Sequence, residues 1–152
     1  MKIFKILRKL LHTDRRTLLM FVEACLLLGW ARCQLFRPFA AIAPKLGERT
    51  RETSLDYDPP CMPAIRQVAH AINTVSRHTP WESKCLVRAI AGMKMLERRR
   101  IDSTLYMGTA KDKTGQLIAH AWLRSGPVYI TGAEVMNRFI VVQKFAKAGR
   151  NC

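Results

Sequence analysis

Residues 83–124 read SKCLVRAIAGMKMLERRRIDSTLYMGTAKDKTGQLIAHAWLR. Within this stretch the spacing of apolar residues changes from the 3.6-residue period of a helix to the two-residue period of a strand. The first part predicts a helix with one apolar face, which begins near Ser83 and ends in the run Arg98-Arg99-Arg100. The second part alternates at 103–110 and again at 116–124, with a turn between them, and so predicts a β-hairpin.

The segments on either side complete the pattern. Upstream, helical spacing predicts a helix over about 63–77 and a longer one that begins near Thr13 or Asp14 and ends near Phe36. Downstream, short strands are predicted at 128–131 and 138–145. Helices come first and an antiparallel meander follows them, so the fold class is α+β, with N-terminal helices packed on the sheet.

The most apolar stretch is TLLMFVEACLLLGWA, residues 17–31. It is shorter than the roughly 20 residues of a bilayer span and contains Glu23, and no small-residue cleavage site of a signal peptide follows it. We therefore expect a buried helix in which Cys25 and Cys33 act as small core residues. The charged and Pro-rich stretch 47–63 that follows is expected to be a linker or surface loop.

Length and composition indicate one domain. The chain has 152 residues, and an apolar fraction of 49% is too high for a disordered chain. We expect a basic amphipathic N-terminal segment at 1–14 and a single domain at 15–152. Five cysteines at wide spacings argue against a disulfide framework and favour a reducing compartment, which predicts a cytoplasmic protein.

The net charge of +15 must either be tolerated by hydration of the surface or be balanced by an acidic partner. A solvated basic surface is the ordinary explanation for such charge. Nucleic-acid binding is not predicted, because the sequence has no recognisable nucleic-acid-binding signature and no metal-ligand spacing. The segment Lys2–Leu11 has an apolar face opposite its Lys and Arg residues, so peripheral contact with the inner face of a membrane is a further prediction.

Two residues stand out as candidates for chemistry. Cys85 lies in the first turn of its predicted helix, where free N–H groups and the helix dipole favour a thiolate. His120 lies in the middle of a predicted strand, where a polar imidazole needs a partner. A lone cysteine or histidine in such places is more often structural. If the strand packs against the helix, however, the two form the nucleophile and base of a cysteine hydrolase or acyltransferase.

The strings around both residues resemble the lasso-peptide B2 proteins, which are transglutaminase-like cysteine proteases of ribosomal peptide biosynthesis. The resemblance covers about residues 15 to 145. It is carried by Trp81, by Cys85-Leu86-Val87-Arg88-Ala89, by Met107-Gly108, by Ala119-His120-Ala121-Trp122-Leu123 and by Arg37-Pro38-Phe39. It implies a papain- or transglutaminase-like fold with Cys85 as nucleophile and His120 as base.

The sequence departs from that family at the third catalytic position. The family has an Asp twelve residues after the His, whereas this chain has Gly132 there. Glu134, Thr131 or a backbone carbonyl could orient His120 instead, and the sequence leaves this choice open. We expect Gly132→Asp to raise the cleavage rate, or at least not to lower it.

The resemblance implies removal of the leader peptide from a ribosomally made precursor before macrolactam formation. The implied partners are the precursor leader, a stand-alone leader-recognition protein and an asparagine-synthetase-like cyclase. That cyclase uses ATP, whereas peptide cleavage by this chain needs no cofactor and no metal. Two other classes stay open: a transamidase or deamidase that uses the same Cys and His, and a non-catalytic peptide-binding module.

Overall fold

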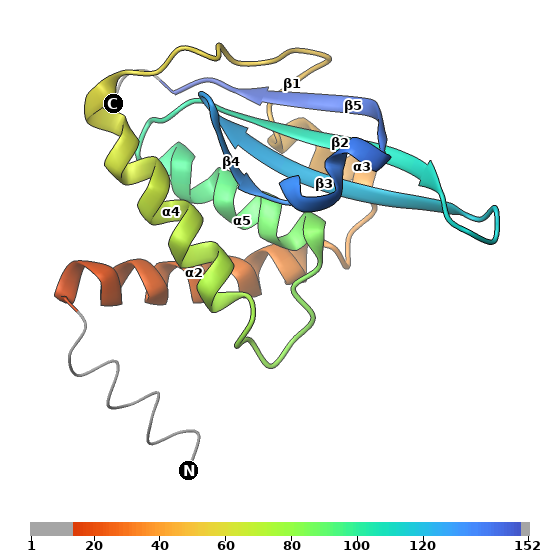
Figure 1. The fold of residues 1–152 in the computed structure, drawn as a ribbon. Coiled ribbons are helices and arrows are strands. Elements are labelled where there is room, and N and C mark those ends of the chain that lie inside the picture. The colour runs from red at the N-terminus through yellow and green to blue at the C-terminus, as the bar shows by residue number, and fades with distance from the viewer. Residues whose placement is uncertain (1–13, 150–152) are drawn as a thin grey trace.

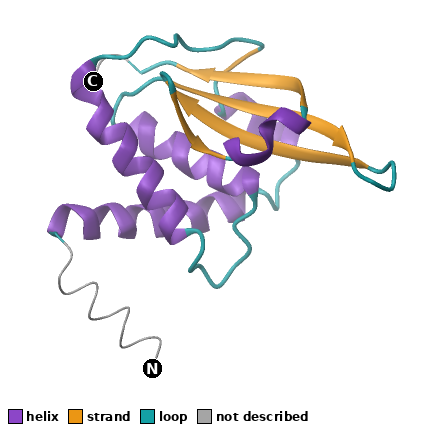
Figure 2. Ribbon diagram, viewed as in Figure 1, coloured by secondary structure: helices purple, strands orange, loops and turns teal. Residues whose placement is uncertain are grey.

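The computed structural model describes residues 14–149 as helices followed by a sheet (Figures 1 and 2). Three helices are long, and short helical turns join the other elements. The helices are α2 (Arg15–Gln34), α3 (Phe39–Ile42), α4 (Met62–Val75) and α5 (Cys85–Arg98), with 3₁₀ turns η1 (Ala43–Lys45), η2 (Pro59–Cys61) and η3 (Ala133–Arg138). The periodicity of the sequence therefore locates each long helix to within about two residues of its ends.

The sheet has five strands in the order β1-β5-β2-β3-β4, all paired antiparallel. Its strands are β1 (Glu48–Arg49), β2 (Ser103–Lys111), β3 (Leu117–Ser125), β4 (Val128–Thr131) and β5 (Ile140–Lys147). Strands β2, β3 and β4 form the predicted meander. Strand β5 then returns through η3 to pair with β2, on the other side of the hairpin. The α+β class expected from the sequence is confirmed.

Helices α2, α4 and α5 pack together below the sheet in Figure 2, and the hydrophobic core lies between the two layers. Helix α5 approaches the strands closely at Gly92. A Cβ atom there would lie 2.9 Å from Leu123 Cδ2 and 3.5 Å from Ile130 Cγ2. A larger residue would have to displace the Leu123 methyl group, so glycine permits the close approach where the helix that begins at Cys85 crosses β3 and β4.

A polar and aromatic cluster lies on the other side of β3. The Arg124 side chain is 2% exposed, and its Nε donates to Tyr106 Oη at 2.9 Å. Its other nitrogens donate to the carbonyls of Thr53, Ser54 and Gly126. Burial raises the pKa of Tyr106 although Arg124 opposes the shift. These bonds hold residues 53–54 against the sheet. The stretch 47–63, predicted as a linker or surface loop, is therefore in part fixed over the outer face of the sheet.

Helix α2 has the predicted bounds but not the predicted burial. Its inner face, at Ala24, Leu28 and Ala31, is completely buried against the other helices. Cys33, however, is exposed, and Cys25 is half-buried and not part of the hydrophobic core, so the prediction that both are core residues is wrong. The helix is apolar on all sides, and a two-layer domain can cover only one of its faces. The predicted amphipathic segment Lys2–Leu11 lies outside the described residues.

Candidate functional site

Cys85 is the first residue of α5. The preceding residue, Lys84, is the N-cap and forms no side-chain hydrogen bond to the helix, and the first turn contains no acidic residue. The first N–H groups of the helix therefore have no side-chain partner from the cap. The thiol is free and half-buried. The sequence predicted this placement from the apolar face that begins at Leu86.

His120 lies on β3 directly opposite Gly108 of β2. Its ring centroid is 5.0 Å from that of Phe139 and 5.9 Å from that of Trp122. A Cβ atom on Gly108 would lie 2.9 Å from Phe139 Cβ and 2.9 Å from the ring of Trp122. The aromatic side chains that flank the imidazole therefore occupy the space that any larger residue at 108 would need. Neither Phe139 nor the reason for Gly108 was identified from the sequence.

One hydrogen bond fixes the imidazole. Its Nε2 lies 2.8 Å from the carbonyl oxygen of Gly132. A carbonyl oxygen only accepts, so Nε2 carries the proton and donates, and in the neutral ring Nδ1 is left as the basic nitrogen. The imidazole is thus held by a backbone carbonyl, whereas the usual triad has a carboxylate in this position.

Gly132 must be a glycine for two reasons. Its φ angle is +76°, which residues with a side chain rarely adopt. A Cβ atom would also lie 2.6 Å from the carbonyl oxygen of Ala121 and 3.1 Å from His120 Nε2. An Asp at this position would displace the imidazole that it was meant to orient. The backbone geometry therefore argues against the expectation that Gly132→Asp raises the cleavage rate, or at least does not lower it.

The other two candidates for the third role do not hold His120. Glu134 is exposed on η3, and no hydrogen bond between its carboxylate and the ring occurs among residues 14–149. Thr131 is buried, but its Oγ1 has no hydrogen-bond partner in the described part of the chain. Of the three alternatives that the sequence left open, only the carbonyl contacts the imidazole.

Cys85 and His120 come from packed elements, but no hydrogen bond joins the thiol to the ring within the described range. On β3, Leu123 and Ala121 belong to the core beneath the sheet, whereas Trp122 stacks on Tyr106 outside that core. Side chains alternate along a strand, so His120 shares the face of Trp122. Helix α5 packs on the opposite, core face of β3, so the structure does not bring the Cys85 thiol and the His120 ring together. Their pairing stays a prediction.

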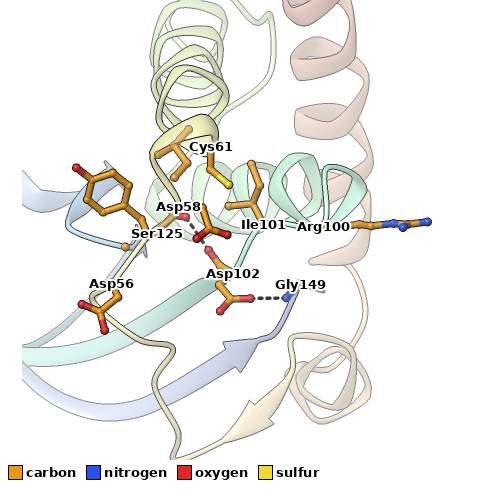
Figure 3. Close-up of a pocket in the computed structure, with 11 residues that line it drawn as sticks. Asp56, Asp58, Cys61, Arg100, Ile101, Asp102, Ser125 and Gly149 are labelled. Carbon is orange, nitrogen blue, oxygen red and sulfur yellow. Dashed lines mark hydrogen bonds between the residues drawn. The ribbon is translucent and has the colours of Figure 1, made fainter. Parts of the chain in front are cut away.

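A cavity of about 260 Å³ lies elsewhere, beyond the C-terminal end of α5 (Figure 3). Asp56, Asp58, Arg100 and Asp102 line it, and the Asp102 carboxylate accepts a hydrogen bond from the Gly149 N–H at 2.6 Å. Cys85 and His120 are not among its lining residues. Residues 14–149 contain no group of three His, Cys, Asp or Glu side chains that could hold a metal ion.

The remaining cysteines in the described range differ from Cys85 in their surroundings. Cys25 and Cys33 are free thiols on α2, whereas Cys61 is buried beside the cavity of Figure 3 and is disulfide-bonded. The composition argued against a disulfide framework but did not reveal this bond. Of the free thiols in residues 14–149, only Cys85 lies at the first residue of a helix.

A comparison with protein families gives one match. The model described as the transglutaminase-like superfamily matches residues 24–144, which include both Cys85 and His120. No curated protein and no solved structure is a significant match to the chain. The family match spans most of the described residues, from α2 to β5.

Proposed function

Because the chain belongs to the transglutaminase-like superfamily, we propose that it is a cysteine peptidase in which Cys85 is the nucleophile and His120 the base. The observation that carries the proposal is the hydrogen bond from His120 Nε2 to the Gly132 carbonyl. It leaves Nδ1 as the nitrogen that can accept the thiol proton. The position of Cys85 at the start of α5 supports the same assignment, because the first N–H groups of the helix have no side-chain partner from the cap and can donate to groups that bind beside the sulfur.

The proposed reaction follows from these two groups. His120 Nδ1 takes the thiol proton, and the Cys85 sulfur attacks the carbonyl carbon of the scissile peptide bond. The imidazolium then gives its proton to the leaving amine, which departs with the C–N bond broken. Water, deprotonated by the same nitrogen, hydrolyses the thioester and restores the thiol. The amine that leaves is the new N-terminus of the C-terminal fragment.

The substrate class proposed is the leader of a ribosomally made lasso-peptide precursor. The combination of Pro80-Trp81, Cys85-Leu86-Val87-Arg88-Ala89 and Ala119-His120-Ala121-Trp122-Leu123 supports this. The leader would be delivered by a stand-alone recognition protein. The freed amine would then be joined to a side-chain carboxylate by an ATP-dependent, asparagine-synthetase-like cyclase. We place the reaction in the cytoplasm, where such precursors are made.

A second function is favoured by two observations. Gly132 stands where the resembling family has its Asp, and the Cys85 thiol has no hydrogen bond to His120 in the described range. Both fit a non-catalytic peptide-binding module. A transamidating member of the same fold is a separate alternative, which these two observations do not distinguish from the peptidase. A transamidase would use the same thioester but pass the acyl group to an amine in place of water.

Incubation with the precursor and its recognition protein, followed by mass spectrometry, distinguishes these functions. The peptidase yields two fragments whose masses together exceed the precursor by one water, and neither Cys85→Ala nor His120→Ala forms them. Cys33→Ala, a change at an exposed free thiol, is the matched control and retains cleavage. A product in which ammonia is lost and an amine gained identifies the transamidase. Binding of the precursor without any product identifies the binding module.

A further inference from the structure

Helix α2 presents a second apolar face to solvent, opposite the one that packs in the core. Leu19 and Leu26 are each 69% exposed, Val22 is 49% exposed and Trp30 is 40% exposed. Their spacing of three and four residues places them on one side of the helix. Phe36, 77% exposed, follows just after the helix ends. We call these five residues the α2 outer stripe. A continuous apolar stripe on a soluble domain marks a contact surface.

The helix is fixed to the domain by its inner face. Ala24, Leu28 and Ala31 have no exposed surface, and α2 packs against both α4 and α5. Its length and composition would suffice to cross a bilayer. Crossing would remove the inner face from the core and expose the apolar sides of α4 and α5. The helix can therefore contact a membrane only by lying along its surface.

The charged residues around the stripe indicate which kind of partner can bind there. Arg15 and Arg16 are exposed at one end and Arg37 is exposed at the other. The single acid in residues 15–37, Glu23, is paired with Arg98 Nε at 3.0 Å and Arg99 Nη2 at 2.6 Å. Within residues 14–149 no ion pair to Arg15, Arg16 or Arg37 occurs, so positive charge borders the stripe. A second copy of a chain with a net charge of +15 would be repelled, whereas an anionic surface would be attracted.

We propose that the α2 outer stripe docks this domain on an anionic phospholipid membrane. The helix lies in the plane of the interface, with the leucines and Val22 among the acyl chains. Trp30 and Phe36 lie at headgroup level, where aromatic rings are favoured, and Arg32, whose guanidinium is 5.0 Å from the Phe36 ring centre, reaches the phosphates. This contact is separate from Cys85 and does not depend on the proposed peptidase activity.

Vesicle sedimentation with the full chain tests the proposal. The wild-type chain should sediment with vesicles of phosphatidylcholine and phosphatidylglycerol, and less so when salt rises from about 0.1 M to about 1 M. The double variant Leu19→Ser/Leu26→Ser should bind at least about tenfold more weakly, because it removes the two most exposed leucines of the stripe from the apolar surface that the acyl chains would bury. Leu117→Ser/Ile140→Ser is the matched control, because these residues are 72% and 76% exposed but lie on the sheet.

The outcomes separate the stripe from other surfaces. Equal binding by the wild type and the Leu19/Leu26 variant would overturn the proposal. It would show that residues outside the α2 outer stripe bind the vesicles. Absence of wild-type binding to these vesicles would also overturn it. If light scattering then showed a dimer that the Leu19/Leu26 variant loses, the partner would be a second copy of the chain. Circular dichroism of each variant verifies folding, because exposed serines leave the core intact.

Discussion

His120 and Gly132 form the central relationship of the candidate site: the imidazole Nε2 donates to the glycine carbonyl oxygen at 2.8 Å. The two residues lie on either side of the β3–β4 hairpin, and Gly132 directly follows the last residue of β4. The bond sets the tautomer of the ring without placing a negative charge beside it. An imidazolium formed during a reaction would therefore gain less stabilisation than it does from a carboxylate.

Gly132→Ala should destabilise the protein by about 1–3 kcal/mol, because it introduces both a strained φ angle and a steric contact. Gly115→Ala is the control: its φ is +83°, but no atom lies within 4 Å of its Cβ position. Chemical denaturation should show a larger loss for Gly132→Ala than for Gly115→Ala. Cleavage should fall only for Gly132→Ala, and Gly132→Asp should behave like it. An active Gly132→Asp variant would contradict the assigned geometry.

Gly108→Ala should impair both activity and stability. The new methyl group would meet Phe139 and Trp122 at 2.9 Å, so the aromatic side chains beside His120 must move. Gly108 has an ordinary backbone conformation, so no φ strain accompanies the change. We expect a fall in kcat per folded molecule, together with a loss of stability of about 1–3 kcal/mol from overpacking. A large loss of stability with normal kcat per folded molecule would mean that the packing at 108 does not control the imidazole.

Cys85 should be the one thiol whose loss abolishes cleavage. Replacement of Cys25, Cys33, Cys61 and Cys152 together by Ser or Ala should preserve the reaction, with some loss of stability from the buried Cys61. Tryptic mapping after alkylation with limiting iodoacetamide at neutral pH should locate the label mainly on Cys85. Loss of activity on changing Cys61 alone, in a protein that still folds, would show that the nucleophile is misassigned.

Arg124→Lys should destabilise the fold by about 2–4 kcal/mol, because an ammonium cannot reach the four acceptors that the guanidinium bonds. The carbonyls of residues 53 and 54 would lose their donors, so the cover over the sheet should loosen. Hydrogen exchange should increase in residues 50–57 before it does in β2 or β3. Arg138→Lys, at an exposed residue on η3, is the control and should leave the exchange unchanged.

Stability should depend on pH through Glu52 and Lys144. A hydrogen bond from Lys144 holds the pKa of Glu52 below its ordinary value of 4.5, and the same contact raises that of Lys144 above 10.5. The contribution of Glu52 is therefore complete above its unfolded pKa and disappears as the pH falls through the lowered value. Glu52→Gln should be less stable than the wild type at pH 7 and equal to it near pH 2. A constant difference across that range would show that the effect is not electrostatic.

Periodicity predicted the elements of this fold because each long helix and each hairpin strand turns one face to the core and another away from it. Apolar residues therefore recur at the period of the element. The alternation at 116–124 thus located β3 almost to the residue. The same pattern gave no information about which strand β5 joins, since its pairing with β2 connects residues distant in the chain. The two-residue β1 is too short to show any alternation.

The candidate site was only partly predictable for a related reason. Cys85 and His120 can be recognised as candidates in the sequence from their residue types. The Gly132 carbonyl cannot, because every residue has a backbone carbonyl. Its role depends on a φ of +76°, which follows from the hairpin and η3 and not from a motif. The exposed stripe on α2 was missed because apolar residues on all sides of a helix do not reveal which side is covered.

The carbonyl of Gly132 has a consequence for mutational scanning. An alanine scan identifies catalytic groups by deleting side chains, and this acceptor survives every side-chain deletion. A scan of the chain would therefore report a two-member site, and the damage at Gly132 would be scored as misfolding. Replacing the peptide bond between Gly132 and Ala133 by an ester, which weakens that carbonyl as an acceptor, would reveal its part in the chemistry.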